Sequence, residues 1–227
     1  MSTCKRAITG MQVITRTFSP RDLVGGHPAL DLVNTVTARN TPAPIDWLDG
    51  YPRLLEWAHL ANLADETQIH TLGKQAIRHA ADAALALEQI KQLREALHAI
   101  YVAMVSDERA PAAALEQLET AWKDAQSGLR LSHVEDRIET LLDARYSGLD
   151  WIRHSIALSA VELLRTLPHG RARICGGEHC GWLFVDTSKG GQRLWCDMAT
   201  CGNAAKARRQ LRKRTSNLKR RKKDMPK

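Results

Sequence analysis

Four of the five cysteines of this 227-residue chain lie in one short segment near its C-terminus. Cys175 and Cys180 are separated by four residues, Cys196 and Cys201 are also separated by four, and fifteen residues lie between the two pairs. A zinc ion takes four thiolates at the corners of a tetrahedron, about 2.3 Å from the metal, and a short loop between two cysteines supplies two of these corners. The spacing therefore predicts one structural zinc ion bound by all four, with disulfides or unlinked buried thiols as the alternatives.

The residues beside the cysteines favour a closed metal shell. Gly181 and Gly202 each follow the second cysteine of a pair, where a backbone with φ > 0 can wrap back over a sulfur. His179 and Asp197 also lie beside cysteines, but four thiolates complete the shell, so we expect neither to bind the metal. A shell without a position for water does not support hydrolytic zinc chemistry, and nothing in the sequence indicates the oxidising compartment that disulfides require.

The charge is divided unevenly along the chain. Residues 201–227 contain twelve Lys or Arg and one acidic residue, a net +11, whereas the whole chain carries +8, so residues 1–200 carry −3. Ala, Arg, Lys and Leu dominate after Asn203, and no proline interrupts them before Pro226, so a helix is predicted to begin at the last zinc ligand. Such a basic arm indicates a polyanionic partner.

Different faces of this basic helix are predicted to contact the zinc module and nucleic acid. One face is a narrow apolar stripe formed by Ala204, Ala207, Leu211 and Leu218. This stripe can dock on Trp182, Phe184 or Trp195 of the zinc module. The other faces carry the candidate nucleic-acid contacts, which are Asn203, Lys206, Arg208, Arg209, Arg212, Lys213, Arg214, Lys219, Arg220 and Arg221. Arg208 and Arg209, nearest the module, are the better candidates for a groove, and the later cations for phosphates. The alternative is a solvated tail with incidental polyanion affinity.

The pattern of the remaining chain predicts an α+β fold. It consists of a mostly helical N-terminal domain with a short strand and a β-hairpin, a small four-Cys zinc module and a basic helix. We expect a strand over 12–18, a helix beginning at Pro28, helices over 52–60, 65–72, 74–105, 111–125 and 149–167, and a hairpin over 129–142. Two helix faces are predicted to be buried, one formed by Ile90, Leu93, Leu97, Ile100 and Met104, the other by Leu115, Leu118 and Trp122. The chain is expected to divide into an extension with a strand (1–18), a mainly helical domain (19–168) and the zinc module with its helix (171–227).

Three polar residues near the N-terminus could line a ligand pocket. Asp31 and Asn34 lie one turn apart on the helix that begins at Pro28, and His27 precedes them. The alternative, which we favour for Asp31 and Asn34, is that they satisfy backbone groups of neighbouring loops, because buried Asp and Asn side chains rarely remain unpaired.

Two stretches resemble one known family. The segment that holds Cys175, Cys180, Trp195-Cys196-Asp197-Met198 and Cys201-Gly202-Asn203 resembles the CGNR zinc finger. The run Gly25-Gly26-His27-Pro28-Ala29-Leu30-Asp31-Leu32-Val33-Asn34-Thr35 resembles the start of the ABATE domain that accompanies this finger. The resemblance implies a stress-induced transcription regulator. Ala204 stands where the family usually has arginine, which leaves the zinc ligands intact but transfers any phosphate contact of that arginine to Lys206 or Arg208.

These observations predict a DNA-binding transcription regulator, with an N-terminal domain that senses a small-molecule effector or forms a homodimer. The alternative from the same module is an RNA- or ribosome-binding zinc protein. A less favoured alternative is an enzyme with its site in the N-terminal domain, where His27, Asp31 and Asn34 would be the first residues to test. An enzyme is not expected, because no nucleophile and base occur at a recognised spacing and no phosphate loop is found. No run is long and apolar enough for a membrane span, and no signal-peptide core is found, so a cytoplasmic location is expected.

Overall fold

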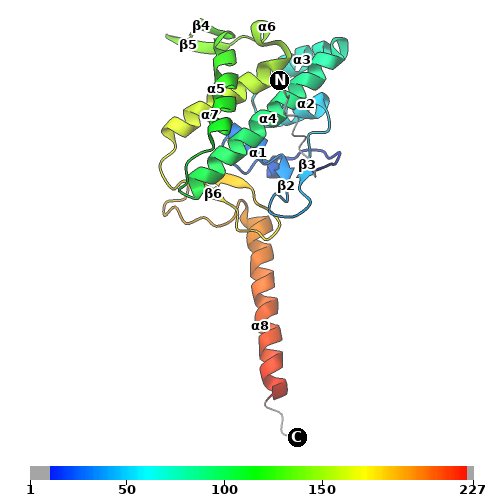
Figure 1. Ribbon diagram of the computed structural model, residues 1–227, viewed down its shortest axis with the longest axis vertical. Coiled ribbons are helices and arrows are strands. Elements are labelled where there is room, and N and C mark those ends of the chain that lie inside the picture. The colour runs from blue at the N-terminus through cyan, green and yellow to red at the C-terminus, as the bar shows by residue number, and fades with distance from the viewer. Residues whose placement is uncertain (1–10, 224–227) are drawn as a thin grey trace.

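The structure, a computed structural model, describes residues 11–223, with side chains through residue 214, and has the predicted α+β class. The helices are α1 (Pro28–Val33), α2 (Tyr51–Leu60), α3 (Glu66–Arg78), α4 (Ala80–Val105), α5 (Ala112–Gln126), α6 (Ala144–Ser147), α7 (Trp151–Thr166) and α8 (Asn203–Lys223), with short turns η1 (Pro20–Asp22), η2 (Gly148–Asp150) and η3 (Met198–Gly202). The strands are β1 (Gln12–Val13), β2 (Val36–Thr37), β3 (Ile45–Asp46), β4 (Leu129–Val134), β5 (Arg137–Leu142), β6 (Ala172–Ile174) and β7 (Leu183–Val185). Helices α1 to α7 form the body, and α8 projects from it on the side opposite the β4–β5 hairpin (Figure 1).

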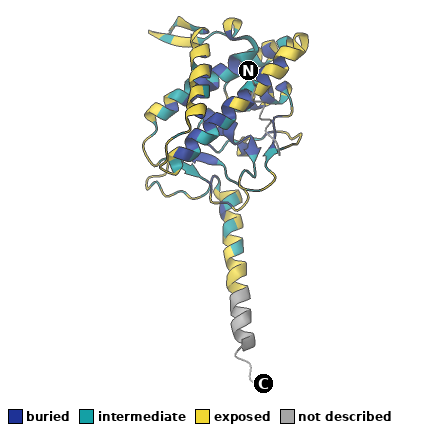
Figure 2. Ribbon diagram, viewed as in Figure 1, coloured by how far each residue is buried: buried dark blue, intermediate teal, exposed yellow. Residues whose placement is uncertain are grey.

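The centre of the body is built by α4 and α7, which contact each other and both contact α1 and α5. The predicted α4 face is buried at four positions, Ile90, Leu93, Leu97 and Ile100, as is the α7 spine of Ile152, Ile156 and Ala160. Buried residues concentrate where these helices meet (Figure 2). The predicted last helix of the domain is confirmed, and so is the hairpin, in which Leu129 pairs with Leu142 and Val134 with Arg137.

Several predicted details are wrong. The helix expected over 74–105 is two helices, because the backbone leaves the helical conformation at His79 (φ −127°, ψ 60°) and α3 folds back against α2 and α4. Met104 and Leu115 are exposed, by 36% and 46%. On α5 the buried face is formed mainly by alanines, which allow α4 and α7 to approach closely, so Leu115 lies to one side. The strand expected over 12–18 forms only at β1.

A buried ion pair attaches the small β1-β3-β2 sheet to α4. The guanidinium of Arg94, fully buried, donates to both carboxylate oxygens of Asp46 at 2.7 and 3.0 Å and to the Thr35 hydroxyl at 3.2 Å. Burial alone would raise the pKa of Asp46, but the hydrogen bonds and charge of Arg94, with the charge of Lys91, lower it. The pair fixes Thr35, the last residue of the run 25–35. This run, which we call the N-terminal signature, contacts the zinc module through Asn34.

Helix α8 stands away from the body, contrary to the predicted docking of its apolar stripe. Ala204, Ala207 and Leu211 are exposed, and the side chain of Leu218 lies outside the described residues. Two of the expected docking partners make other contacts: Phe184 is fully buried inside the zinc module, and Trp182 packs edge-on against Trp47. Figure 2 shows that most residues in the described part of α8 are exposed. Within the described residues, no helix has the length and apolarity to cross a membrane.

Candidate zinc centre and nucleic-acid interface

The four predicted cysteines converge at the ends of the β6–β7 ribbon and in η3. Cys175 follows β6, Cys180 precedes β7, and Cys201 lies in η3. Their sulfurs all lie within 4.8 Å of one another, and the Cys196 sulfur is 3.6 Å from that of Cys180 and 3.7 Å from that of Cys201. A tetrahedron with Zn–S bonds of 2.3 Å has edges of about 3.8 Å, whereas a disulfide bond measures about 2.05 Å. The four cysteines are free of disulfides and form a site for one structural zinc ion.

The surroundings of the sulfurs suit thiolates. The Cys175 sulfur accepts hydrogen bonds from the backbone N–H groups of Gly177 at 3.4 Å and Cys196 at 3.3 Å. Four thiolates within 4.8 Å of one another repel, so all four can be deprotonated together only with a cation between them. A zinc ion supplies that charge and deprotonates its ligands. Gly177 permits the close approach, because a Cβ there would lie 3.1 Å from the Cys201 sulfur.

The residues beside the zinc ligands shape the backbone around the site. Gly181 has φ = +71°, as predicted. The same expectation for Gly202 is wrong, because Gly202 lies inside η3, where a side chain would collide with Met198 and Trp195. Asp197 begins η3 by accepting hydrogen bonds from the N–H groups at 199 and 200. Neither Asp197 nor His179 belongs to the ligand cluster found among the described residues.

The N-terminal signature holds the outer edge of β7. The Asn34 amide donates to the Leu183 carbonyl oxygen at 2.8 Å and accepts from the Leu183 N–H at 2.9 Å, and both residues are buried. Asp31 accepts from the Gly25 N–H at 2.8 Å, while the Gly25 carbonyl accepts from the Val185 N–H at 2.8 Å. Asp31 and Asn34 therefore satisfy backbone groups, which is the alternative that the sequence analysis favoured.

His27, Asp31 and Asn34 line neither the hollow of about 490 Å³ along α8 nor the hollow of about 540 Å³ beside the zinc module. His27 caps α1 by accepting from the Ala29 N–H at 3.2 Å. Burial raises the pKa of Asp31 to about 6, with the Gly25 hydrogen bond acting in the opposite direction. The structure thus gives His27, Asp31 and Asn34 internal hydrogen bonds, and their role in ligand binding stays a prediction.

Asn40 contacts the zinc module in a way that the sequence pattern does not predict. Its side-chain amide donates to the carbonyl oxygens of Gly177 at 3.2 Å and Glu178 at 2.8 Å, in the loop between the first two cysteines. Asn40 also lies 3.4 Å from the position of a Cβ on Gly181, so the two loops fit closely. No local pattern marks Asn40, because its partners lie 137 and 138 residues away in the sequence.

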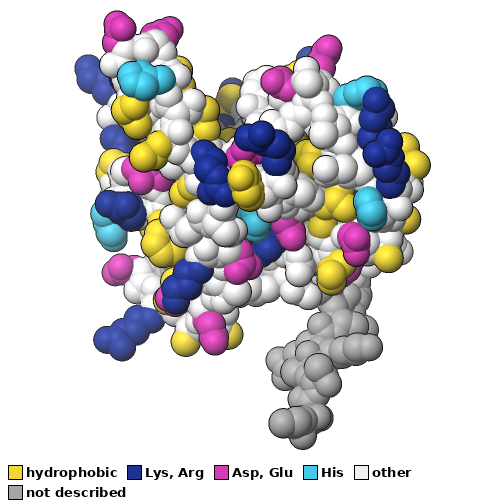
Figure 3. All heavy atoms as spheres, turned by 90° about the horizontal axis from the view of Figure 1, so that it is seen from above, with side chains coloured by type: hydrophobic (Ala, Val, Ile, Leu, Met, Phe, Trp, Pro, Cys, Tyr) yellow, Lys and Arg dark blue, Asp and Glu magenta, His cyan; other side chains and the backbone are white. Residues whose placement is uncertain are grey.

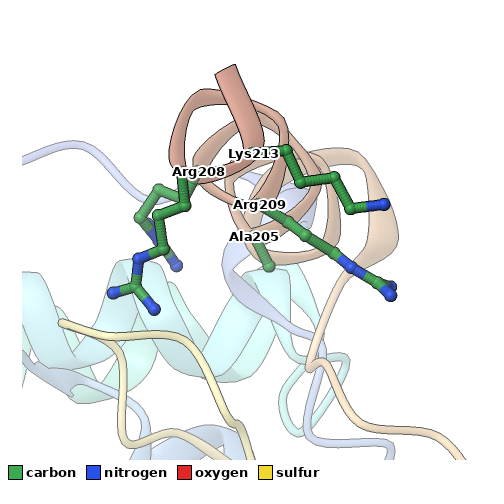
Figure 4. A pocket seen from close by; sticks show the side chains of 5 residues that line it. Ala205, Arg208, Arg209 and Lys213 are labelled. Atoms are coloured by element: carbon green, nitrogen blue, oxygen red, sulfur yellow. The ribbon is translucent and has the colours of Figure 1, made fainter. Parts of the chain in front are cut away.

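Helix α8 carries two rows of cations on either side of Ala205. Arg208 and Arg212 form one row, Arg209 and Lys213 form the other, and together with Ala205 they line a hollow of about 490 Å³. Figure 4 shows the Arg208 side chain directed to one side of Ala205 and those of Arg209 and Lys213 to the other. On the face of the body seen in Figure 3, by contrast, Lys and Arg are interspersed with Asp and Glu.

The other predicted nucleic-acid residues differ in position. Lys206 and Arg214 are exposed outside this hollow. Asn203 is exposed and donates to the Ala199 carbonyl oxygen at 3.1 Å. Arg208 forms an ion pair with Glu178 at 3.2 Å. The side chains of Lys219, Arg220 and Arg221 lie outside the described residues, although the α8 backbone continues through them.

A closed four-cysteine centre at the start of a basic helix, attached to a mainly helical domain, defines a zinc-finger protein. The comparison with protein-family models assigns residues 26–167 to ABATE, described as "Putative stress-induced transcription regulator", and residues 171–214 to the CGNR zinc finger. The ABATE match covers more than half of the chain, so the chain belongs to the ABATE family and carries a CGNR zinc finger, as the sequence resemblance predicted. A comparison with curated proteins found no match.

Proposed function

We propose that this protein is a transcription regulator that binds DNA through α8, with the zinc centre fixing the start of the helix. The observation that carries the proposal is the projection of α8 away from the body together with its two rows of cations. The described residues of its apolar stripe, Ala204, Ala207 and Leu211, are exposed, so α8 gains little from packing, and its cations remain available to a partner. We expect the protein to act in the cytoplasm.

The charges of α8 favour a polyanion. No acidic residue occurs between Asn203 and Lys223. Like charges four residues apart on a helix destabilise it by about 0.2–0.5 kcal/mol per pair, and both Arg208–Arg212 and Arg209–Lys213 are such pairs. Phosphates placed between the rows would replace this repulsion with attraction and release counterions.

The shape of α8 favours DNA over RNA. Its 21 residues extend for about 31 Å. The major groove of B-form DNA is about 12 Å wide and admits a helix, whereas the major groove of A-form RNA is deep and narrow. A single projecting helix with cations on two sides can therefore enter the DNA groove and contact both of its phosphate walls.

The test compares the salt dependence of duplex binding between two triple variants. Replacing Arg208, Arg209 and Arg212 with Gln removes three cations from α8. The control replaces the exposed body cations Lys74, Arg78 and Arg109 with Gln, which changes the net charge equally. Each lost phosphate contact lowers the slope of log K against log salt by about 0.9, so we expect a decrease of about 2.7 for the α8 variant alone.

Equal slopes in the α8 variant and the wild-type protein would show that α8 is not the contact surface. If the salt slope decreases equally in both variants, the decrease reflects the lost net charge and not a contact made by α8. Tighter binding of duplex RNA than of duplex DNA at the same salt concentration would replace the DNA proposal with the RNA-binding alternative. Zinc content, measured for each variant, shows that the module remains folded.

A further inference from the structure

A second hollow lies where the N-terminal segment, the zinc module and the start of α8 meet. It has a volume of about 540 Å³ and is lined by residues from all three parts, including Arg16, Arg21, Trp47, Glu178, Trp182 and Arg208. Small-molecule sites in proteins span about 300–1,000 Å³ and are mostly apolar with a few polar groups. The size and composition of this junction hollow fall within that description.

The half-buried Trp182 supplies the aromatic wall of the junction hollow, and Trp47, which is 6% exposed, supports it from behind. Trp47 and Trp182 meet edge to face, with ring centroids 5.7 Å apart and an interplanar angle of 84°. The guanidinium of Arg16 lies 4.0 Å from the centre of the Trp47 ring. Planar aromatic ligands pack against such rings, and aromatic pairs contribute about 0.5–1.5 kcal/mol beyond the area they bury.

The charges of the hollow are paired except at one position. Asp22 pairs with Arg16 at 2.7 Å, and Glu178 pairs with Arg208 at 3.2 Å. Arg21 is exposed and forms no ion pair among the residues that the structure describes. Three zinc ligands also line the hollow, namely Cys180, Cys196 and Cys201. Their thiolates disfavour an anion beside the metal, so a ligand anion is expected at Arg21.

We propose that the junction hollow binds a small aromatic carboxylate, with its ring against Trp182 and its carboxylate at Arg21. Arg208 lines both this hollow and the one along α8, so the ligand and nucleic acid share one residue. Occupation of the junction hollow therefore weakens the nucleic-acid contact of Arg208, and by linkage nucleic acid weakens ligand binding equally. The coupling between ligand and nucleic acid rests on the proposed DNA-binding function.

Titration calorimetry on the zinc-loaded full chain tests the site directly, with 2-naphthoate and benzoate as probes and their neutral amides as controls. We expect saturable binding of the acids, about tenfold tighter than of the amides. Arg21→Gln should abolish this preference, and Arg78→Gln, an exposed arginine on α3, should preserve it. Absence of saturable binding by either acid up to about 5 mM, equal binding of acid and amide, or an unchanged preference in Arg21→Gln would each overturn the proposal.

The DNA experiment separates this proposal from the preceding one. If acids bind and 2-naphthoate weakens DNA binding by the wild-type protein, both are supported. If the α8 variant loses its salt slope but no acid binds, only the ligand site fails. If acids bind and no variant affects DNA binding, only the DNA proposal fails. A DNA salt slope lowered by about 0.9 in Arg21→Gln without acid binding would assign the hollow to the nucleic-acid interface instead.

Discussion

Replacement of Asn34 by Ala tests the link between the N-terminal signature and the zinc module. The Asn34 side chain is the hydrogen-bond partner of both polar backbone groups of Leu183, at 2.8 and 2.9 Å. Asn34 is 2% exposed and Leu183 is 1% exposed, so water does not replace a lost contact there. The substitution leaves one donor and one acceptor buried without partners.

The expected loss of stability follows from these two groups. An unsatisfied buried polar group costs about 1–3 kcal/mol. Two such groups, partly relieved by local movement, are expected to lower the free energy of unfolding by about 3 kcal/mol. Since natural domains have only about 5–15 kcal/mol of net stability, the effect is large enough to measure by urea denaturation.

The matched control is Asn40→Ala, which also removes two hydrogen bonds to the zinc module, to the carbonyl oxygens of Gly177 and Glu178. The bond to Glu178 is solvent-exposed, so water can take its place and the expected loss is about 1 kcal/mol. Urea denaturation followed by circular dichroism measures both variants, and a coloured chelator reports zinc release. Equal losses for Asn34→Ala and Asn40→Ala would refute the reasoning that burial decides the cost.

Two other predictions concern the metal and pH. Cys196→Ser removes a thiolate from the zinc shell and is expected to release zinc and abolish DNA binding, because structural zinc contributes folding free energy directly; a zinc-to-protein ratio still near one would contradict this. Burial raises the pKa of Asp31 from 3.8 to about 6, so the folded state loses about 2–3 kcal/mol of stability as pH rises from about 4 to 6. Asp31→Asn should remove that loss, so that denaturation midpoints at pH 4.5 and 7 differ less in the variant than in the wild-type protein.

The zinc site could be predicted because it depends on local spacing. Loops of four residues bring paired cysteines together whatever the rest of the fold does, and Cys175 and Cys196 are buried as a structural site requires. The hairpin and the central helix α7 were also predicted from periodicity. The break at His79 was not, since neither glycine nor proline marks it, and packing of α3 against α2 decides where the helix ends.

The position of α8 could not be predicted from the spacing of its apolar residues alone. Its apolar stripe predicted a docked helix, but docking needs a free surface as well as an apolar face. Phe184 belongs to the core of the zinc module and Trp182 contacts Trp47, and neither fact is visible in the sequence. The same limit applies to Asn34, whose partner lies 149 residues away.

The contacts of β7 determine how α8 is oriented with respect to the helical domain. Ala172 and Leu183, from the ribbon of the zinc module, belong to the same hydrophobic core as α1 and α4. The ribbon is therefore fixed to the body, and the cysteines at its ends are fixed with it. Beyond Cys196 the chain reaches α8 through η3, which contains Cys201. Loss of zinc should therefore release α8 while α1 to α7 remain folded, and a ligand bound at the proposed junction site would act at the segment where that freedom begins.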